Sequence, residues 1–241
     1  LESENATKIS SNKPDNWHWQ LKEMIDSESL SNFCKNKAFL TFNYDRSLDQ
    51  VLFNMINAYE VSEEQKREHF STIPIIHLHG QIAFLPHQKD KRKKYGSHAY
   101  GKHDFSEYSL AAQTTELRIT YENFELEKET NLKLANHYIS KAKTILFIGF
   151  AYDEYNLDRL NFGNSAQIYG TAFGLDRYEQ TRVKDYFKKR HNKDINFFDN
   201  NNPDIVKNID AAQFLKNIID TENVNKMSKI TKKCFLWDEN K

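Results

Sequence analysis

The stretch Thr144-Ile145-Leu146-Phe147-Ile148-Gly149 decides the fold, because it is continuously apolar until it ends at a glycine. A strand that is covered on both faces has this pattern, whereas a strand with one face in water alternates between apolar and polar residues. Four further short apolar runs lie at 38–41, 73–78, 168–173 and 195–198. Several of them also lack a regular alternation, so we predict parallel strands buried inside the molecule.

Segments with helical periodicity lie between these runs. Apolar residues recur at helical spacing over 17–35, 46–60, 122–142, 177–190 and 204–219. Strands that alternate with helices predict an α/β fold built on a Rossmann-like, doubly wound parallel sheet.

The chain divides into three parts. We expect a helical lead-in over 1–35, the α/β domain over 36–220 with a basic irregular insertion at 86–104, and a polar, peripheral tail over 221–241. The insertion is interpreted as a solvated loop, although its lysines also suit phosphate groups.

Composition narrows the classes of function. The 34 lysines and arginines balance the 34 aspartates and glutamates, so the whole chain has no electrostatic attraction to nucleic acid or to an acidic membrane. Nucleic acid is therefore expected only indirectly, through a partner. With two cysteines the chain cannot form a four-cysteine zinc site. No apolar run is long enough to span a membrane, and we expect a cytoplasmic protein.

Polar residues and glycines follow the ends of the predicted strands, which is where parallel sheets bind ligands. The first strand ends in Thr41-Phe42-Asn43-Tyr44-Asp45 and the second in His77-Leu78-His79-Gly80. Gly149 and Gly174 follow the third and fourth. Ordinary structural roles also fit these residues, because Asp45 stands where a helix N-cap would stand and Asn43 is a common turn residue.

His77 and His79 are two residues apart on a predicted strand and so project from the same face. This is also the spacing of a metal-binding pair. A metal site needs further ligands, and the sequence offers no clear third or fourth one. A metal-dependent hydrolase is therefore retained only as an alternative.

Three of these segments resemble motifs of the SIR2 superfamily, in the family's order, within residues 36–200. The segment from Thr41 to Asp45 resembles its T-x-N-hydrophobic-D motif, and Ile76 to Gly80 resembles its strand ending in a catalytic His-Gly. The segment from Ile145 to Ala151 resembles its third nucleotide-binding segment. Asn-Tyr-Asp together with Gly-Phe-Ala is most similar to the SIR2-like NADases of bacterial anti-phage defence.

The resemblance implies a NAD⁺ hydrolase that releases ADP-ribose and nicotinamide, with NAD as the substrate. Asn43 would position the ribose and the attacking water, and His79 would act as the base. The other expected nucleotide contacts are Thr41, Asp45, Gly80, Gly149, Phe150, Asp153 and Gly174. The implied role is NAD depletion during phage infection (abortive infection), in a homo-oligomer or a larger defence complex with a sensor domain or protein.

The sequence also departs from the family. The family opens with a glycine-rich strand, loop and helix that bind the pyrophosphate, but the first glycine here is Gly80. Because the chain does not begin with methionine, we expect this element to lie upstream, to be supplied separately, or to be absent. In the last case the domain would be a degenerate module that binds a nucleotide or a partner without catalysis.

Overall fold

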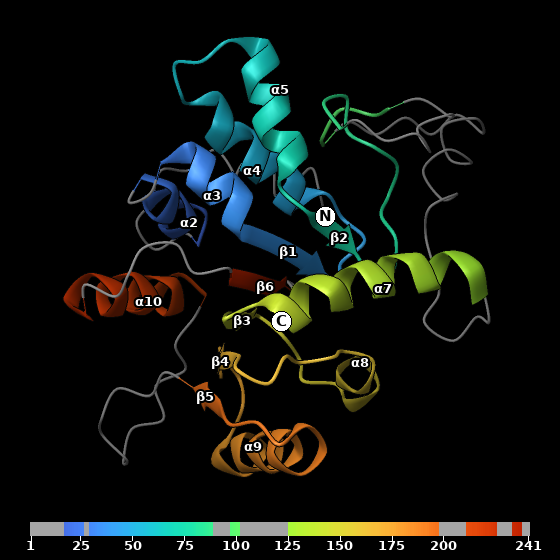
Figure 1. The fold of residues 1–241 in the computed structure, drawn as a ribbon, viewed down its shortest axis with the longest axis vertical. Coiled ribbons are helices and arrows are strands. Elements are labelled where there is room, and N and C mark those ends of the chain that lie inside the picture. Colours follow the sequence, from blue (N-terminus) through green and yellow to red (C-terminus); the bar gives the residue numbers. More distant parts are fainter. Residues whose placement is uncertain are drawn as a thin grey trace.

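The computed structural model describes residues 17–26, 29–88, 97–101, 125–197, 211–225 and 233–237. Strands and helices alternate along most of this chain (Figure 1). In chain order the elements are α2 (Trp17–Asp26), α3 (Leu30–Asn36), β1 (Lys37–Thr41), α4 (Ser47–Asn57), α5 (Glu63–Thr72), β2 (Ile75–His77), α7 (Glu125–Lys141), β3 (Thr144–Ile148), α8 (Glu154–Asp158), β4 (Gln167–Gly170), α9 (Arg177–His191), β5 (Ile195–Phe197), α10 (Ala211–Asn225) and β6 (Lys233–Trp237).

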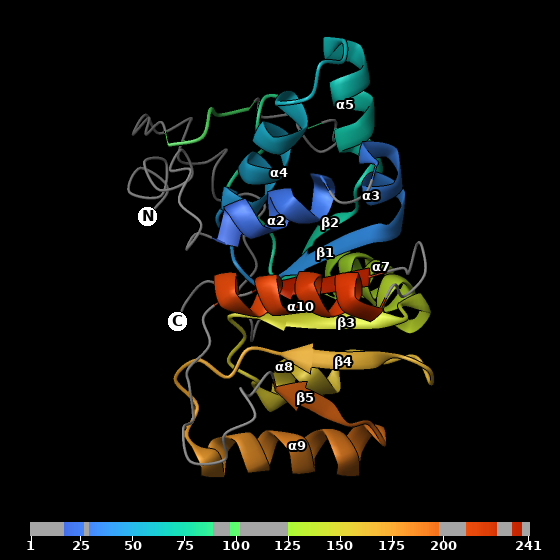
Figure 2. The same ribbon diagram turned by 90° about the vertical axis from the view of Figure 1, so that its left-hand side faces the viewer.

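The strands form one six-stranded sheet in the order β2-β1-β6-β3-β4-β5, and all of its pairings are parallel. Figure 1 labels β6 between β1 and β3, and Figure 2 shows α10 in front of this part of the sheet. Every residue of β1 is paired with one of β6, and every residue of β6 is paired with one of β3. The predicted α/β fold with parallel strands is therefore confirmed.

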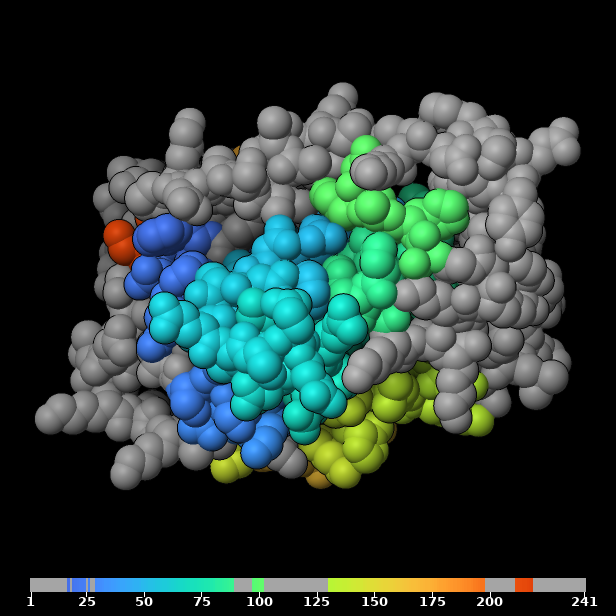
Figure 3. All heavy atoms as spheres, turned by 90° about the horizontal axis from the view of Figure 1, so that it is seen from above, coloured from blue at the N-terminus to red at the C-terminus, as the bar shows by residue number. Residues whose placement is uncertain are grey.

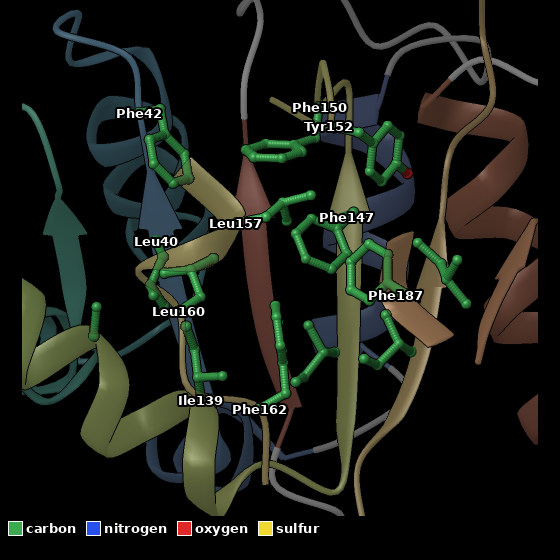
Figure 4. Packing of buried hydrophobic residues seen from close by; sticks show 14 of the residues in the cluster. Leu40, Phe42, Ile139, Phe147, Phe150, Tyr152, Leu157, Leu160, Phe162 and Phe187 are labelled. Atoms are coloured by element: carbon green, nitrogen blue, oxygen red, sulfur yellow. The ribbon is translucent and has the colours of Figure 1, made fainter. Parts of the chain in front are cut away.

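Each face of the sheet carries its own apolar cluster, because successive side chains of a strand point to opposite faces. Phe39, Leu146 and Ile148 project into a cluster that includes residues of α2, α3, α4, α5 and α10. Leu40 and Phe147 project into the other cluster, which includes residues of α7, α8 and α9 (Figure 4). All five residues of β1 are buried, as expected for a strand covered on both sides.

The last strand corrects one prediction. We expected residues 221–241 to be a peripheral tail, but the backbone of β6 lies in the middle of the sheet. Its four apolar residues, Cys234 to Trp237, are too few to stand out between lysines and acidic residues. The sheet accommodates this short run because parallel pairing on both sides satisfies its backbone hydrogen-bonding groups. The position between β1 and β3 is thus filled by a strand from a segment that we expected to lie outside the sheet.

Two helices also differ from the prediction. α5 was not predicted, and it begins with a capping box in which Ser62 and Gln65 bond each other's backbone N–H. α10 was expected over 204–219 and is described over Ala211–Asn225. Most of the basic insertion lies outside the described residues, which here include only its ends at 86–88 and 97–101.

Candidate functional site

The turn that follows β1 is shaped by its own side chains. Thr41 and Asn43 are both buried, and the Thr41 Oγ1 atom accepts a hydrogen bond from the backbone N–H of Asn43 at 3.0 Å. The carboxylate of Asp45 accepts one from the backbone N–H of Ser47, the first residue of α4, at 2.9 Å. The N-cap position itself belongs to Arg46, whose side chain makes no capping bond. Asp45, the residue before the N-cap, therefore supplies the capping hydrogen bond of α4.

His77, at the end of β2, lies in a buried network of hydrogen bonds. Its Nε2 atom is 2.9 Å from Asp49 Oδ2, and its Nδ1 atom is 3.1 Å from the backbone oxygen of Asn43. The His77 and Asp49 side chains are only 4% and 1% exposed. Burial lowers the pKa of His77, but the charges of Asp49 and Asp45 and the two hydrogen bonds more than offset it, so its pKa is raised. A doubly donating imidazolium fits these contacts.

His79 lies two residues after the end of β2, next to two aromatic rings. The centroid of its ring is 5.3 Å from that of Phe42 and 6.1 Å from that of Tyr44. Gly80 has a φ of 81°, a left-handed conformation that favours glycine, and its N–H donates to the backbone oxygen of His77. The main chain therefore turns back just after β2 and places His79 beside the residues that follow β1.

The end of β3 is tied to the end of β4. Gly149 has a φ of 62°, and its N–H donates to Thr171 Oγ1 at 2.9 Å. Tyr152 also has a positive φ, 55°, which is unusual for a bulky residue. Its buried hydroxyl donates to the backbone oxygen of Thr171 at 2.8 Å, and burial raises its pKa. These bonds hold the backbone in a conformation that it would not adopt by itself.

A row of rings in edge-on or tilted contact runs along the carboxyl ends of the strands. The ring of Phe150, which we expected to contact a nucleotide, is buried in the middle of this row (Figure 4). The successive centroid distances are 5.3 Å for His79–Phe42, 5.2 Å for Phe42–Phe150, 5.5 Å for Phe150–Tyr152 and 5.6 Å for Tyr152–Phe197. These ring contacts connect the ends of β1 and β3 and continue to the edge strand β5.

Two predicted residues are exposed and have local roles. Asp153 is the N-cap of α8, where its side chain accepts a hydrogen bond from the backbone N–H of Asn156. Gly174 lies in the turn before α9 with a φ of 78°. The structure thus brings Thr41, Asn43, Asp45, His79 and Gly80 together at the ends of β1 and β2. It connects Gly149 and Phe150 to them through the ring contacts, whereas, among the described residues, no hydrogen bond or ring contact links Asp153 or Gly174 to the group.

A cleft of about 260 Å³ opens beside β2, and His77, Gly80, Gln81 and Gln88 contribute to its lining. Gln88 donates to Asp49 Oδ1 at 2.6 Å. Segment 97–101 lies against residues 81–85, as the space-filling view shows (Figure 3).

Asp49, Gln81 and Gln88 were missed by sequence reasoning. One signal pointed to Asp49, because it is an acidic residue next to the apolar stripe of a predicted helix. The two glutamines had no signal, since their places depend on an irregular segment.

The described parts of the chain contain no group of three His, Cys, Asp or Glu residues that is arranged to hold a metal ion. The ring of His77 is already occupied by Asp49 and by the Asn43 backbone, so its pairing with His79 as metal ligands has no support here.

Comparison of the chain with protein-family models, with curated proteins and with solved structures finds no match. Within the described residues, no helix is both long enough and apolar enough to cross a membrane.

Proposed function

We propose that this protein hydrolyses NAD⁺ to ADP-ribose and nicotinamide at the carboxyl ends of β1 and β2. The observation that carries the proposal is the joint placement of Asn43 and His79, which stand at adjacent ends of parallel strands. Ligands of parallel α/β sheets bind at that edge. The sheet order and the apolar clusters on both faces also support a Rossmann-like, doubly wound arrangement.

The chemistry suits these residue types. Cleavage of the N-glycosidic bond develops positive charge on the ribose, and a water molecule must then attack the anomeric carbon. The amide of Asn43 would orient the ribose and this water. The imidazole of His79 would accept a proton, because histidine titrates near neutral pH. Both residues are buried, which strengthens any electrostatic interaction with the reacting groups.

The biological part of the proposal comes from the sequence resemblance. A SIR2-like NADase of this kind would deplete cellular NAD during phage infection. It would act as a homo-oligomer or within a defence complex whose sensor starts the reaction. A cytoplasmic location follows from that role.

A second candidate is a nucleotide-binding module without catalysis. Its support is the strand at the centre of the sheet. In dinucleotide-binding folds the central strand leads into a glycine-rich loop that holds the pyrophosphate. Here β6 is followed by Asp238 and Glu239 and not by glycines, so the loop that catalysis on a dinucleotide would need does not follow this strand.

NAD⁺ consumption by the purified chain, with chromatography of the products, tests both candidates. We expect release of nicotinamide, with the rate reduced about 10²–10⁴-fold in His79→Ala and in Asn43→Ala. His137→Ala is the matched control, because His137 is an exposed histidine near the end of α7. Its rate should be unchanged.

Binding distinguishes the remaining outcomes. Calorimetric titration with ADP-ribose that shows binding, in a chain that leaves NAD⁺ intact, would favour the binding module. A chain that neither binds nor cleaves would contradict both candidates. If His137→Ala lowered the rate as much as His79→Ala, the assignment of His79 as the base would be wrong.

A further inference from the structure

We infer that His77 is a positioning residue, which fixes the main chain of Asn43 by donating a hydrogen bond to its carbonyl oxygen while Asp49 orients the imidazole. The kinetic part of this inference rests on the proposed NAD⁺ hydrolysis. Its structural part is independent of any reaction.

Both peptide groups next to the Asn43 Cα atom are held. The N–H donates to Thr41 Oγ1 at 3.0 Å, and the carbonyl lies 3.1 Å from His77 Nδ1. Two fixed peptide groups determine the direction of the Cα–Cβ bond, from which the amide of Asn43 projects. The turn contributes no regular secondary structure that would do this instead. A shift of about 1 Å in a positioning group is enough to reduce a rate about 100-fold.

The imidazole of His77 is in turn oriented from α4. Asp49 Oδ2 is 2.9 Å from Nε2, and Asp49 Oδ1 accepts from Gln88 at 2.6 Å. Gln88 Oε1 accepts from the backbone N–H of Leu85 at 2.7 Å and from the Gln81 amide at 3.2 Å. The chain of contacts runs from Leu85 through Gln88, Asp49 and His77 to Asn43. It makes the position of Asn43 depend on segment 81–88, which closes one side of the cleft beside β2.

His77 itself is unsuited to act as the base. Both of its ring nitrogens face acceptors, and Asp49 and Asp45 are the acidic groups that act on it. A base needs a nitrogen lone pair directed at the proton that it removes. The inference therefore assigns His77 to positioning and leaves proton transfer to His79.

Two isosteric variants separate the two bonds of His77. The amide nitrogen of asparagine stands where Nδ1 stands in histidine, and that of glutamine stands where Nε2 stands. His77→Asn therefore keeps the donor to the Asn43 carbonyl and loses the bond to Asp49. His77→Gln keeps the bond to Asp49 and loses the donor to Asn43. The experiment measures kcat and KM for NAD⁺ hydrolysis and thermal unfolding for both variants.

The positioning role predicts opposite rankings of activity and stability. His77→Gln should lower kcat about 100-fold with a much smaller change in KM. His77→Asn should retain more of kcat, yet unfold at a lower temperature, because it leaves the buried carboxylate of Asp49 without the hydrogen-bond donor that His77→Gln keeps. A merely structural role predicts that the variant with the lower unfolding temperature also has the lower kcat. That result would overturn the inference.

Asp49→Asn provides a second test in case His77→Asn does not fold. An asparagine at this position donates to Nε2 and accepts from Gln88, so His77 becomes neutral with its proton on Nδ1. The donor to Asn43 survives, and kcat should stay within about threefold of the parent value, because the same contact is kept. A kcat as low as that of His77→Gln would contradict the inference.

Hydrogen exchange at the backbone N–H groups of residues 43–47 tests positioning without NAD⁺. Exchange there should be faster in His77→Gln than in Asp49→Asn and in the parent chain. Equal exchange in all three would overturn the inference even if the enzyme is active. Faster exchange in His77→Gln alone, in a parent chain that does not hydrolyse NAD⁺, would support the positioning contact and contradict only the proposed function.

Discussion

Gly170, the last residue of β4, is in close contact with Tyr152. A Cβ atom at Gly170 would lie 2.0 Å from the Tyr152 hydroxyl oxygen, which is fully buried and bonded to the Thr171 carbonyl. The Tyr152 ring is packed against Phe147, Phe150 and Phe197, so its hydroxyl cannot shift away without disturbing these contacts. We therefore predict that Gly170→Ala lowers the free energy of unfolding by about 1–3 kcal/mol, measured by urea denaturation.

The double variant with Tyr152→Phe identifies the cause. Removing the hydroxyl costs about 1 kcal/mol for its hydrogen bond, but it also removes the atom that the new methyl group meets. Gly170→Ala should therefore cost less in the Tyr152→Phe background. Gly174→Ala is the control, because it has a positive φ and no atom within 4 Å of the added Cβ. Its cost should be the same in both backgrounds. Additive effects for Gly170→Ala would rule out the steric explanation.

Helix α9 is capped at both ends, with Asn192 as a left-handed C-cap whose N–H donates to the Phe187 carbonyl. It begins with a capping box, in which Asp176 accepts from the backbone N–H of Glu179 at 2.8 Å and Glu179 accepts from that of Asp176 at 2.9 Å. Only Val183 and Phe187 of this helix are buried, so packing stabilises it little. Asp176→Ala should therefore lower the free energy of unfolding by about 1 kcal/mol, measured by circular dichroism during thermal unfolding.

Two variants of the same helix serve as references. Asp176→Ser retains an oxygen that can accept the capping bond, and it should restore most of the lost stability. Asp185→Ala removes an exposed acid whose ion pair with Lys189 spans 3.8 Å, and it should change stability by less than about 0.5 kcal/mol. An Asp185→Ala effect as large as that of Asp176→Ala would show that charge, not capping, accounts for the loss.

Strands β1 to β5 and most of the described helices were predictable because each carries its own pattern. The apolar run ending at Gly149 needs both of its faces covered, and it forms β3, which lies between β6 and β4 in the sheet. α5 was not predictable from periodicity, because Phe70 is its only buried residue. All of its other residues are polar, so the helix has no apolar stripe. Its Ser62 and Gln65 capping box was the available signal.

For the candidate site, the sequence allowed us to predict which residues follow the strand ends, but not their contacts with helices. Asn43 and His79 follow two runs that the sequence marks as strands, and parallel pairing brings those ends together. The bond between His77 and Asp49 depends on how α4 packs onto β2, which neither segment encodes alone. Phe150 matched a motif by position, but its ring became part of the buried row, because apolar burial decides the orientation of a phenylalanine.

At the scale of the whole molecule, β6 joins two halves of the sheet. Without it, β2 and β1 form one pair of strands and β3, β4 and β5 form another set, because every pairing between these groups passes through β6 (Figure 1). The apolar clusters on both faces contain residues from β1 and from β3. Separation of the two halves would therefore expose both cores to water.

We predict that a chain ending at Asn225 loses cooperative thermal unfolding and binds the dye ANS, which reports exposed apolar surface. A chain ending at Trp237 is the matched control, since it keeps β6 and removes only the four residues that follow it. A synthetic peptide of residues 230–241 should restore a cooperative transition to the shorter chain, because the strand pairs through its backbone with both neighbours. If the chain ending at Asn225 unfolds as cooperatively and at the same temperature as the control, the central place of β6 is wrong. The prediction follows from the position of β6 in the sheet and not from its composition, because its backbone pairs with both neighbouring strands.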